Sequence, residues 1–285
     1  MGKESDIQYC DSTVNGEMGC DGCELWTGDI RRCYAGTLTE LRKGHKGFPA
    51  EFTTPELFTK RFADCVKWKD LTGLDRVDKS WLNGYPRIIF QGDMGDYWTE
   101  SLPIDWLLPY FELLESSPHI HLFLTKRPHR MLQTFKLFGR VPRNFWLGTS
   151  ITNQETAKRQ EAITNIKHEF DCVNWISYEP NVGNVHFTDR TLEALDWLVT
   201  GGESDQEQPA RPMDFFFLRK LLAWLEDFSV ARFVKQLGSV WAKGNFVYKR
   251  DMHGGDWSLW PQALKIREMP QPKARPESQI NLALA

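Results

Sequence analysis

Six short apolar segments between residues 86 and 238 constrain the fold of this chain more than any other feature. They are PRIIFQGD, HIHLFLTKR, FWLGTS, CVNWISYEP, LDWLVTGGES and ARFVKQLG, and each ends in polar or glycine-rich sequence. Continuous apolar runs of this length are typical of strands buried on both faces of a parallel sheet. Helical patterns lie between several of them: IDWLLPYFELLE, HRMLQTFKLF, NQETAKRQEAITNI and MDFFFLRKLLAWLEDF. The alternation predicts successive βαβ units.

Six parallel strands with right-handed crossovers predict an α/β fold, either a complete or partial (β/α) barrel or an open doubly wound sheet. A chain of 285 residues is long enough for one such domain, to which we assign residues 1–268. Residues 269–285, MPQPKARPESQINLALA, are rich in proline and polar residues and predict a flexible tail.

Charge and hydropathy argue against two classes of protein. The formal net charge of -3 does not fit a generally basic surface that binds nucleic acid through its backbone, although local basic groups remain. No stretch approaches the roughly 20 apolar residues of a membrane span, and the first ten residues lack a signal-peptide pattern. We therefore expect a cytoplasmic protein without membrane contact.

Four of the six cysteines, Cys10, Cys20, Cys23 and Cys33, fall within 24 residues. Cytoplasmic thiols are reduced, so clustered cysteines are better explained as metal ligands than as disulfides. Glycines at positions 16, 19, 22 and 28 suit a cysteine loop, residues 10–36, that folds back on itself. Three thiolates would leave one iron of a cluster open, whereas four would close an iron–sulfur or zinc site. The spacing alone leaves both alternatives open.

Polar residues follow the predicted strands at the edge where parallel α/β folds carry their functional sites. They are Gln91, Gly92, Asp93, Lys126, Arg127, Ser150, Glu179, Glu203, Lys235 and Gln236. Asp93 follows a strand in a glycine-rich segment and can accept hydrogen bonds from an ammonium group. Lys126 and Arg127 can bind a phosphate or a carboxylate. The remaining two cysteines, Cys65 and Cys172, lie in apolar patterns and are expected in the core.

Together these segments resemble an uncharacterised phage- and prophage-associated family of radical-SAM-like proteins, named for a three-Cys motif. The resemblance covers about residues 7–241 and rests on DSTVNGEMGCDGC and on Cys33, Tyr34 and Ala35. It continues through IIFQGDMGDYW, LTKRPHRM, FWLGTSITNQ, ISYEPNVGNV, DWLVTGGES followed by ARPM, and FVKQLG. The chain lacks the tryptophan common in the first segment, and two and then nine residues separate its cysteines, unlike the radical SAM pattern Cys-x3-Cys-x2-Cys.

The resemblance implies a TIM-like radical S-adenosylmethionine (SAM) barrel with a [4Fe-4S] cluster on Cys20, Cys23 and Cys33. It implies that SAM is cleaved to a 5'-deoxyadenosyl radical, which acts on an unknown substrate, and a nucleotide or nucleic acid is our candidate. An electron donor of the flavodoxin or ferredoxin type and a three-Cys-motif companion protein are the expected partners. On this hypothesis the cofactor-binding residues are Tyr34, Gly92, Asp93, Ser150 and Glu179, the catalytic residues Lys126, Glu203 and Lys235, and the substrate-binding residues Arg127 and Gln236.

Two further hypotheses stay open. A non-catalytic barrel, stabilised by zinc or an iron–sulfur cluster, would bind nucleic acid or a partner protein, and it predicts Cys10 as a fourth ligand. A metal-independent hydrolase would use Asp93, Glu179 or Glu203 as acid and base, and it predicts two carboxylates a few Å apart.

Overall fold

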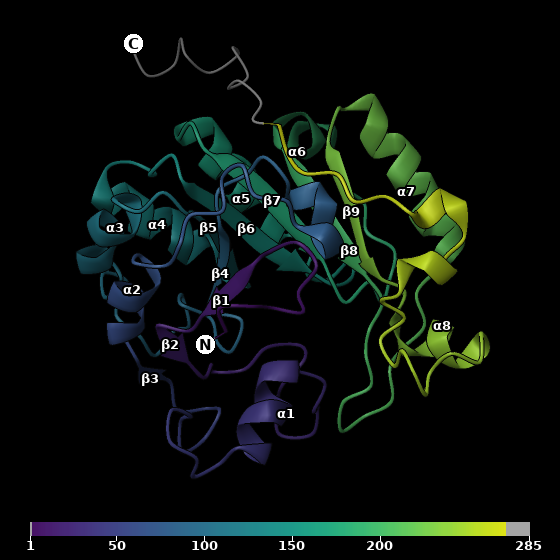
Figure 1. The fold of residues 1–285 in the computed structure, drawn as a ribbon, viewed down its shortest axis with the longest axis horizontal. Coiled ribbons are helices and arrows are strands. Elements are labelled where there is room, and N and C mark those ends of the chain that lie inside the picture. Colours follow the sequence, from purple (N-terminus) through teal and green to yellow (C-terminus); the bar gives the residue numbers. More distant parts are fainter. Residues whose placement is uncertain (1, 272–285) are drawn as a thin grey trace.

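Seven parallel strands form the main sheet of this computed structural model, which describes residues 2–271 (Figure 1). In spatial order they are β1 (Ser12–Val14), β4 (Ile88–Gln91), β5 (Ile120–Thr125), β6 (Phe145–Ile151), β7 (Val173–Tyr178), β8 (Trp197–Gly201) and β9 (Ala231–Gln236). The strand order follows the chain and never reverses, which excludes the doubly wound alternative. Since β1 and β9 do not pair with each other, the sheet is a half-barrel and not a complete barrel.

Helices join successive strands and cover the outer face of the sheet (Figure 1). They are α3 (Leu108–Glu115), α4 (Pro128–Phe138), α5 (Arg159–Glu169), α6 (Asp189–Ala194) and α7 (Phe215–Asp227). Outside this repeat lie α1 (Tyr34–Leu41), α2 (Lys60–Cys65), α8 (Gly238–Gly244), an antiparallel pair of β2 (Glu17–Met18) with β3 (Glu56–Leu57), and 3-10 helices at Val77–Leu82, Trp257–Leu259 and Gln262–Leu264. The six predicted strands are confirmed, and β1 is an addition to them.

Local sequence explains where the helices begin and end. Pro128 occupies the first turn of α4, where no backbone N–H is required, and Gly139 ends that helix with a φ of 82°. Asp214 caps α7 by accepting hydrogen bonds from the backbone N–H groups of Phe216 and Phe217, both at 3.0 Å. These signals place α7 so that its leucines face the sheet.

The concave side of the half-barrel is filled by aromatic rings at its N-terminal end. Tyr9 contacts Phe90, Trp175, Trp197 and Phe233 edge-on, with ring centroids 5.7–6.0 Å apart. Gly148 leaves room for Trp175, because a Cβ at this position would lie 2.4 Å from the indole. The segment before β1 therefore closes the floor of the half-barrel.

The C-terminal segment crosses the same floor. Glu268 accepts a hydrogen bond from the Trp197 indole at 3.0 Å, and the carbonyl of Pro270 accepts one from the Tyr85 hydroxyl at 3.3 Å. The first residues of the predicted tail are thus docked, and residues 272–285 of that tail lie outside the described residues. No helix within residues 2–271 has the length and apolar character needed to cross a membrane.

Candidate functional site

Residues 19–36 of the cysteine loop lie at the C-terminal ends of the strands, an end of the half-barrel that we call the mouth (Figure 1). Gly19 pairs with Gly95, which follows β4, and the backbone N–H of Asp21 donates to the Thr99 hydroxyl at 2.9 Å. These contacts bring Cys20 above the end of β4. The loop is then held by three groups of ionic contacts with different strands.

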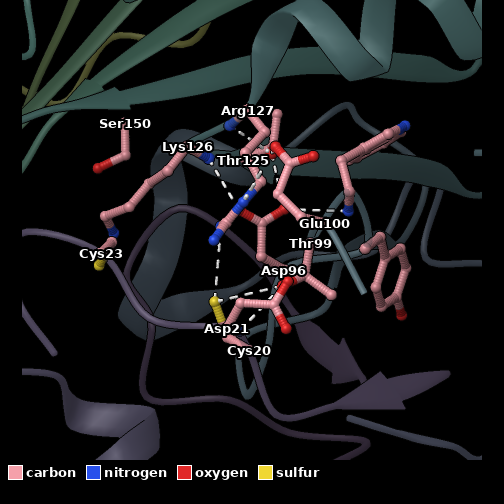
Figure 2. Close-up of polar contacts among 12 residues, drawn as sticks. Cys20, Asp21, Cys23, Asp96, Thr99, Glu100, Thr125, Lys126, Arg127 and Ser150 are labelled. Carbon is pink, nitrogen blue, oxygen red and sulfur yellow. Dashed lines mark hydrogen bonds and ion pairs between the residues drawn. The ribbon is translucent and has the colours of Figure 1, made fainter. Parts of the chain in front are cut away.

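Arg127, directly after β5, makes the first of these contacts (Figure 2). Its guanidinium donates to Asp96 at 2.9 Å, to the carbonyl of Gly22 at 2.8 Å and to the Cys20 sulfur at 3.5 Å. Burial disfavours the charge of Arg127, but Asp96 and Cys20 more than offset it and raise its pKa. A residue predicted to bind substrate therefore ties the cysteine loop to the sheet.

Glu24 makes the second contact, with Arg159 at the start of α5. Two hydrogen bonds of 3.0 and 2.8 Å join them, and Arg159 also donates to the Ser150 carbonyl at 2.9 Å. Although burial alone would raise the pKa of Glu24, Arg159 and Lys126 lower it to about 2. This carboxylate is ionised at neutral pH and anchors the loop to β6.

Glu203, after β8, makes the third contact. Its carboxylate accepts hydrogen bonds from Arg32 of the cysteine loop at 3.2 Å and from Arg211 at 2.6 and 2.9 Å. The Glu203 side chain is only 4% exposed. The carboxylate of this predicted catalytic residue is therefore bound by two arginines.

At the mouth, Cys23 lies near both Cys20 and Cys33. Burial and Asp96 raise the pKa of Cys20 to about 12, and Cys23 contributes to this increase. Burial also raises the pKa of Cys33, again with a contribution from Cys23, while Lys126 and the first N–H groups of α1 lower it. Cys33 precedes α1 directly, so the start of this helix faces its sulfur.

Lys126 directs its ammonium group at these thiols, and Figure 2 shows it reaching towards Cys23. Burial would lower the pKa of Lys126, yet Cys23, Glu24 and Cys33 raise it above the ordinary value. The sequence placed Lys126 at the mouth, and the structure adds that it faces the cysteines. The mouth thus holds a permanent positive charge beside Cys23 and Cys33.

Cys10 lies apart from this group. It is fully buried among the rings on the floor, and burial raises its pKa to about 12. The next residue, Asp11, pairs with the first residue of β4, whereas Cys20 lies beyond the end of that strand. Four strand residues separate the two ends by about 13 Å. The fourth ligand expected by the closed-site hypothesis is therefore not Cys10.

The predicted cofactor residues line the mouth between these contacts. Glu179 forms an ion pair of 2.7 Å with Lys235, and its carbonyl accepts a hydrogen bond from the Ser150 hydroxyl at 3.2 Å. Asp93 accepts a hydrogen bond from the Asn15 side chain at 2.8 Å, and burial raises the pKa of its carboxyl. The structure thus brings Glu179, Lys235 and Ser150 together.

Three further predicted residues, Gly92, Tyr34 and Gln236, range from packed to exposed. Gly92 has a φ of 81°, and a Cβ there would lie 2.8 Å from the Tyr97 ring. Tyr34 is 54% exposed at the start of α1. Gln236 donates to the Gly202 carbonyl at 2.9 Å and to the Ser204 hydroxyl at 2.8 Å, which leaves it in a local network at the end of β9.

Several residues around the mouth escaped prediction. The floor residue Tyr9 reaches up towards it: burial raises the pKa of Tyr9, Glu179 and Asp93 add to this increase, and the Lys235 nitrogen is 6.0 Å from its ring centre. Asp96 lies in the same glycine-rich segment as Asp93, so its position was a usable signal. Arg32 and Arg159 had no such signal, because their partners are 171 and 135 residues away in sequence.

A second hollow lies elsewhere, along α7. Its volume is about 450 Å³, and its walls include Val185, His186, Phe217, Leu221 and Trp224. None of its lining residues belongs to the cysteine loop or to the predicted site. We place the candidate site at the mouth because thiols and ion pairs lie there, whereas this hollow is mainly apolar.

The fold is an α/β half-barrel, and Cys20, Cys23 and Cys33 lie at its mouth. The chain matches, over residues 4–264, the family described as "Protein of unknown function (DUF5131)", and it belongs to that family. No curated protein and no solved structure matches it significantly. Family membership names no activity, so the function has to be argued from the site.

Proposed function

We propose that this protein is an atypical radical SAM enzyme. The observation that carries the proposal is that Cys20, Cys23 and Cys33 lie together at the mouth beside Lys126, while Cys10 is buried at the floor. Three thiolates leave one iron of a [4Fe-4S] cluster open to a small molecule, and parallel α/β barrels carry their active sites at this end.

Thiolates are the protein ligands of iron–sulfur clusters, and Cys20, Cys23 and Cys33 offer sulfur donors alone. As the side chains stand, no three His, Cys, Asp or Glu side chains among residues 2–271 are arranged to hold a metal ion. A zinc ion needs every ligand within about 2.3 Å of one point, whereas each thiolate of a cluster binds a different iron. Cys20, Cys23 and Cys33 would hold the cluster, and Lys126 and Arg127 would offset its negative charge.

The bound cluster would supply one electron to cleave SAM into methionine and a 5'-deoxyadenosyl radical. Asp93 would accept hydrogen bonds from the ammonium group of SAM. Gly92, with a φ of 81° and the Tyr97 ring packed against it, would let the chain turn after β4 so that Asp93 faces the ligand. Ser150 and Glu179 would bind the ribose hydroxyls of SAM, and Tyr34 would contact its adenine. The protein's own tasks are binding, orientation and exclusion of water.

The other predicted residues take two kinds of role. Lys235 holds Glu179 at 2.7 Å and remains our candidate for contact with the substrate, as does Gln236. Arg127 and Glu203 hold the cysteine loop in place, so we propose them as positioning residues. The flavodoxin- or ferredoxin-type donor and the three-Cys-motif companion remain proposed partners.

Anaerobic reconstitution with iron and sulfide, followed by EPR of the reduced protein with and without SAM, tests the proposal. We expect a [4Fe-4S]+ signal that SAM perturbs in the wild type and in Cys10→Ala, and no such signal in Cys33→Ala. Cys172→Ala is a second control, because Cys172 lies in the core away from the mouth. Stoichiometric zinc without a cluster would overturn the proposal and favour the non-catalytic binding protein.

A further inference from the structure

Two arms project from the rim of the mouth. The first arm, residues 34–47, contains α1 and follows Cys33 directly; the second arm, residues 238–250, contains α8 and begins two residues after Gln236. In Figure 1 both helices lie beyond the same end of the sheet, with the loop after β8 between them. Whatever the arms bind is therefore held next to the cysteines and to Lys235.

The arms are basic on a chain that is acidic overall. The first arm has three Lys or Arg residues against one Glu, and the second has three against no acidic residue, while the whole chain has a net charge of -3. Lys43 and Lys243 pair with Glu51 and Asp205. The other cations are exposed and form no ion pair with any described residue: Arg42, Lys46, Lys249 and Arg250. Positive charge is thus concentrated beside the mouth.

Phe246 is the tip of the second arm. Its side chain is 96% exposed, and its φ of 61° lies in the left-handed region, which is unfavourable for a bulky residue. The turn around it is held from within: Val247 and Tyr248 donate to the Ala242 carbonyl, and the Tyr248 hydroxyl donates to Asp205 at 2.6 Å. The turn therefore presents the Phe246 ring to solvent.

We propose that the two arms bind single-stranded nucleic acid across the mouth. Unpaired cations attract phosphates, and an exposed aromatic ring stacks on unpaired bases without regard to their identity. A duplex does not fit this surface as well, because its bases offer no free face to Phe246. Binding itself is independent of the radical chemistry; only the statement that the bound strand is the substrate rests on the proposed function.

Fluorescence anisotropy with a labelled DNA or RNA strand of about 12 nucleotides, within the usual site sizes, tests binding in protein without cluster or SAM. We expect Phe246→Ala to weaken binding about fivefold or more, since stacking contributes about 1 to 3 kcal/mol per base. Lys249→Glu with Arg250→Glu should weaken it about tenfold or more and reduce the salt dependence by about 1 to 2 in slope.

Matched variants on α7 provide the controls. Phe216→Ala removes another exposed phenylalanine, and Arg219→Glu with Lys220→Glu reverses the same amount of charge on another surface. Both should bind like the wild type. Equal binding of duplex DNA or polyglutamate, or an unchanged affinity in Phe246→Ala, would overturn the proposal. A SAM-perturbed cluster signal in a protein that binds no strand would reject this inference and leave the proposed function standing.

Discussion

The two ends of the half-barrel are stabilised by different interactions. At the floor, Tyr9 packs edge-on against Trp175 and Trp197, and these two tryptophans are tilted against each other and completely buried. At the mouth, the cysteine loop is held by ion pairs such as Glu24 with Arg159 and Arg32 with Glu203. The burial of large apolar side chains is strongly stabilising and non-directional, whereas ion pairs fix direction and cost desolvation. The floor therefore supplies stability, and the mouth supplies geometry.

Trp175→Ala should have the largest effect, because it opens a cavity in the floor. Loss of a fully buried tryptophan is expected to lower the free energy of unfolding by about 3 to 5 kcal/mol. Urea denaturation measures this difference, with the exposed Phe216→Ala as the control, where we expect less than about 0.5 kcal/mol. If Trp175→Ala lowered the free energy of unfolding by less than the surface variant does, the floor would not be a main source of stability.

Asp196→Asn tests a buried ion pair near the N-terminal ends of the strands. Asp196 and Lys167 lie 2.9 Å apart with side chains 0% and 1% exposed, and the change removes the negative charge of this pair. We expect a loss of about 3 to 5 kcal/mol in thermal or urea unfolding. Lys136→Gln breaks the half-exposed pair with Glu169 and should cost less than about 1 kcal/mol. Equal losses of stability in the two variants would show that burial does not determine how much removing an ion-pair partner costs.

Asp93→Asn should separate binding from stability at the mouth. On the proposed function, loss of the carboxylate weakens SAM binding about tenfold or more, measured by calorimetry, while exposed Asp227→Asn does not. Because burial raises the Asp93 pKa in the folded protein, its ionisation opposes folding. This penalty begins to shrink when the pH falls below the raised value and is gone below the unfolded pKa near 3.8. At neutral pH, Asp93→Asn should therefore be at least as stable against unfolding as the wild type. Unchanged SAM affinity would remove Asp93 from the site.

Glu24→Gln should cost less stability than Trp175→Ala or Asp196→Asn, about 1 to 3 kcal/mol. The pair with Arg159 is partly exposed, and the drop of the Glu24 pKa from 4.5 to about 2 sets the upper limit. The lowered pKa of about 2 means that the ionised carboxylate stabilises the folded state above the unfolded pKa near 4.5, and that this contribution is lost as the pH falls towards 2. The stability difference between wild type and variant should shrink over that interval. Hydrogen exchange should rise in residues 19–33 and not in the floor. Faster exchange at Trp175 would contradict the separation of the two ends.

Sequence patterns predicted the sheet better than they predicted the mouth. The six apolar runs became β4 to β9, since a parallel strand buried on both faces has to be apolar along its length. β1 escaped because Ser12–Val14 has only three residues, two of them polar, and its strand character comes from pairing with β4. The sequence also could not distinguish a complete barrel from a partial one. A barrel closes only if β1 and β9, the two edge strands, pair with each other, and no local pattern predicts that pairing.

For the candidate site, the sequence by itself determined which chemical groups are available: three closely spaced thiols, and polar residues after buried strands. Only the tertiary structure decided their partners. It placed Cys10 at the floor, turned Arg127 and Glu203 towards the cysteine loop, and exposed Phe246 beside the mouth. The physical reason is that burial and periodicity are local properties of a chain, whereas an ion pair between residues 171 positions apart exists only once the strands have brought its ends together.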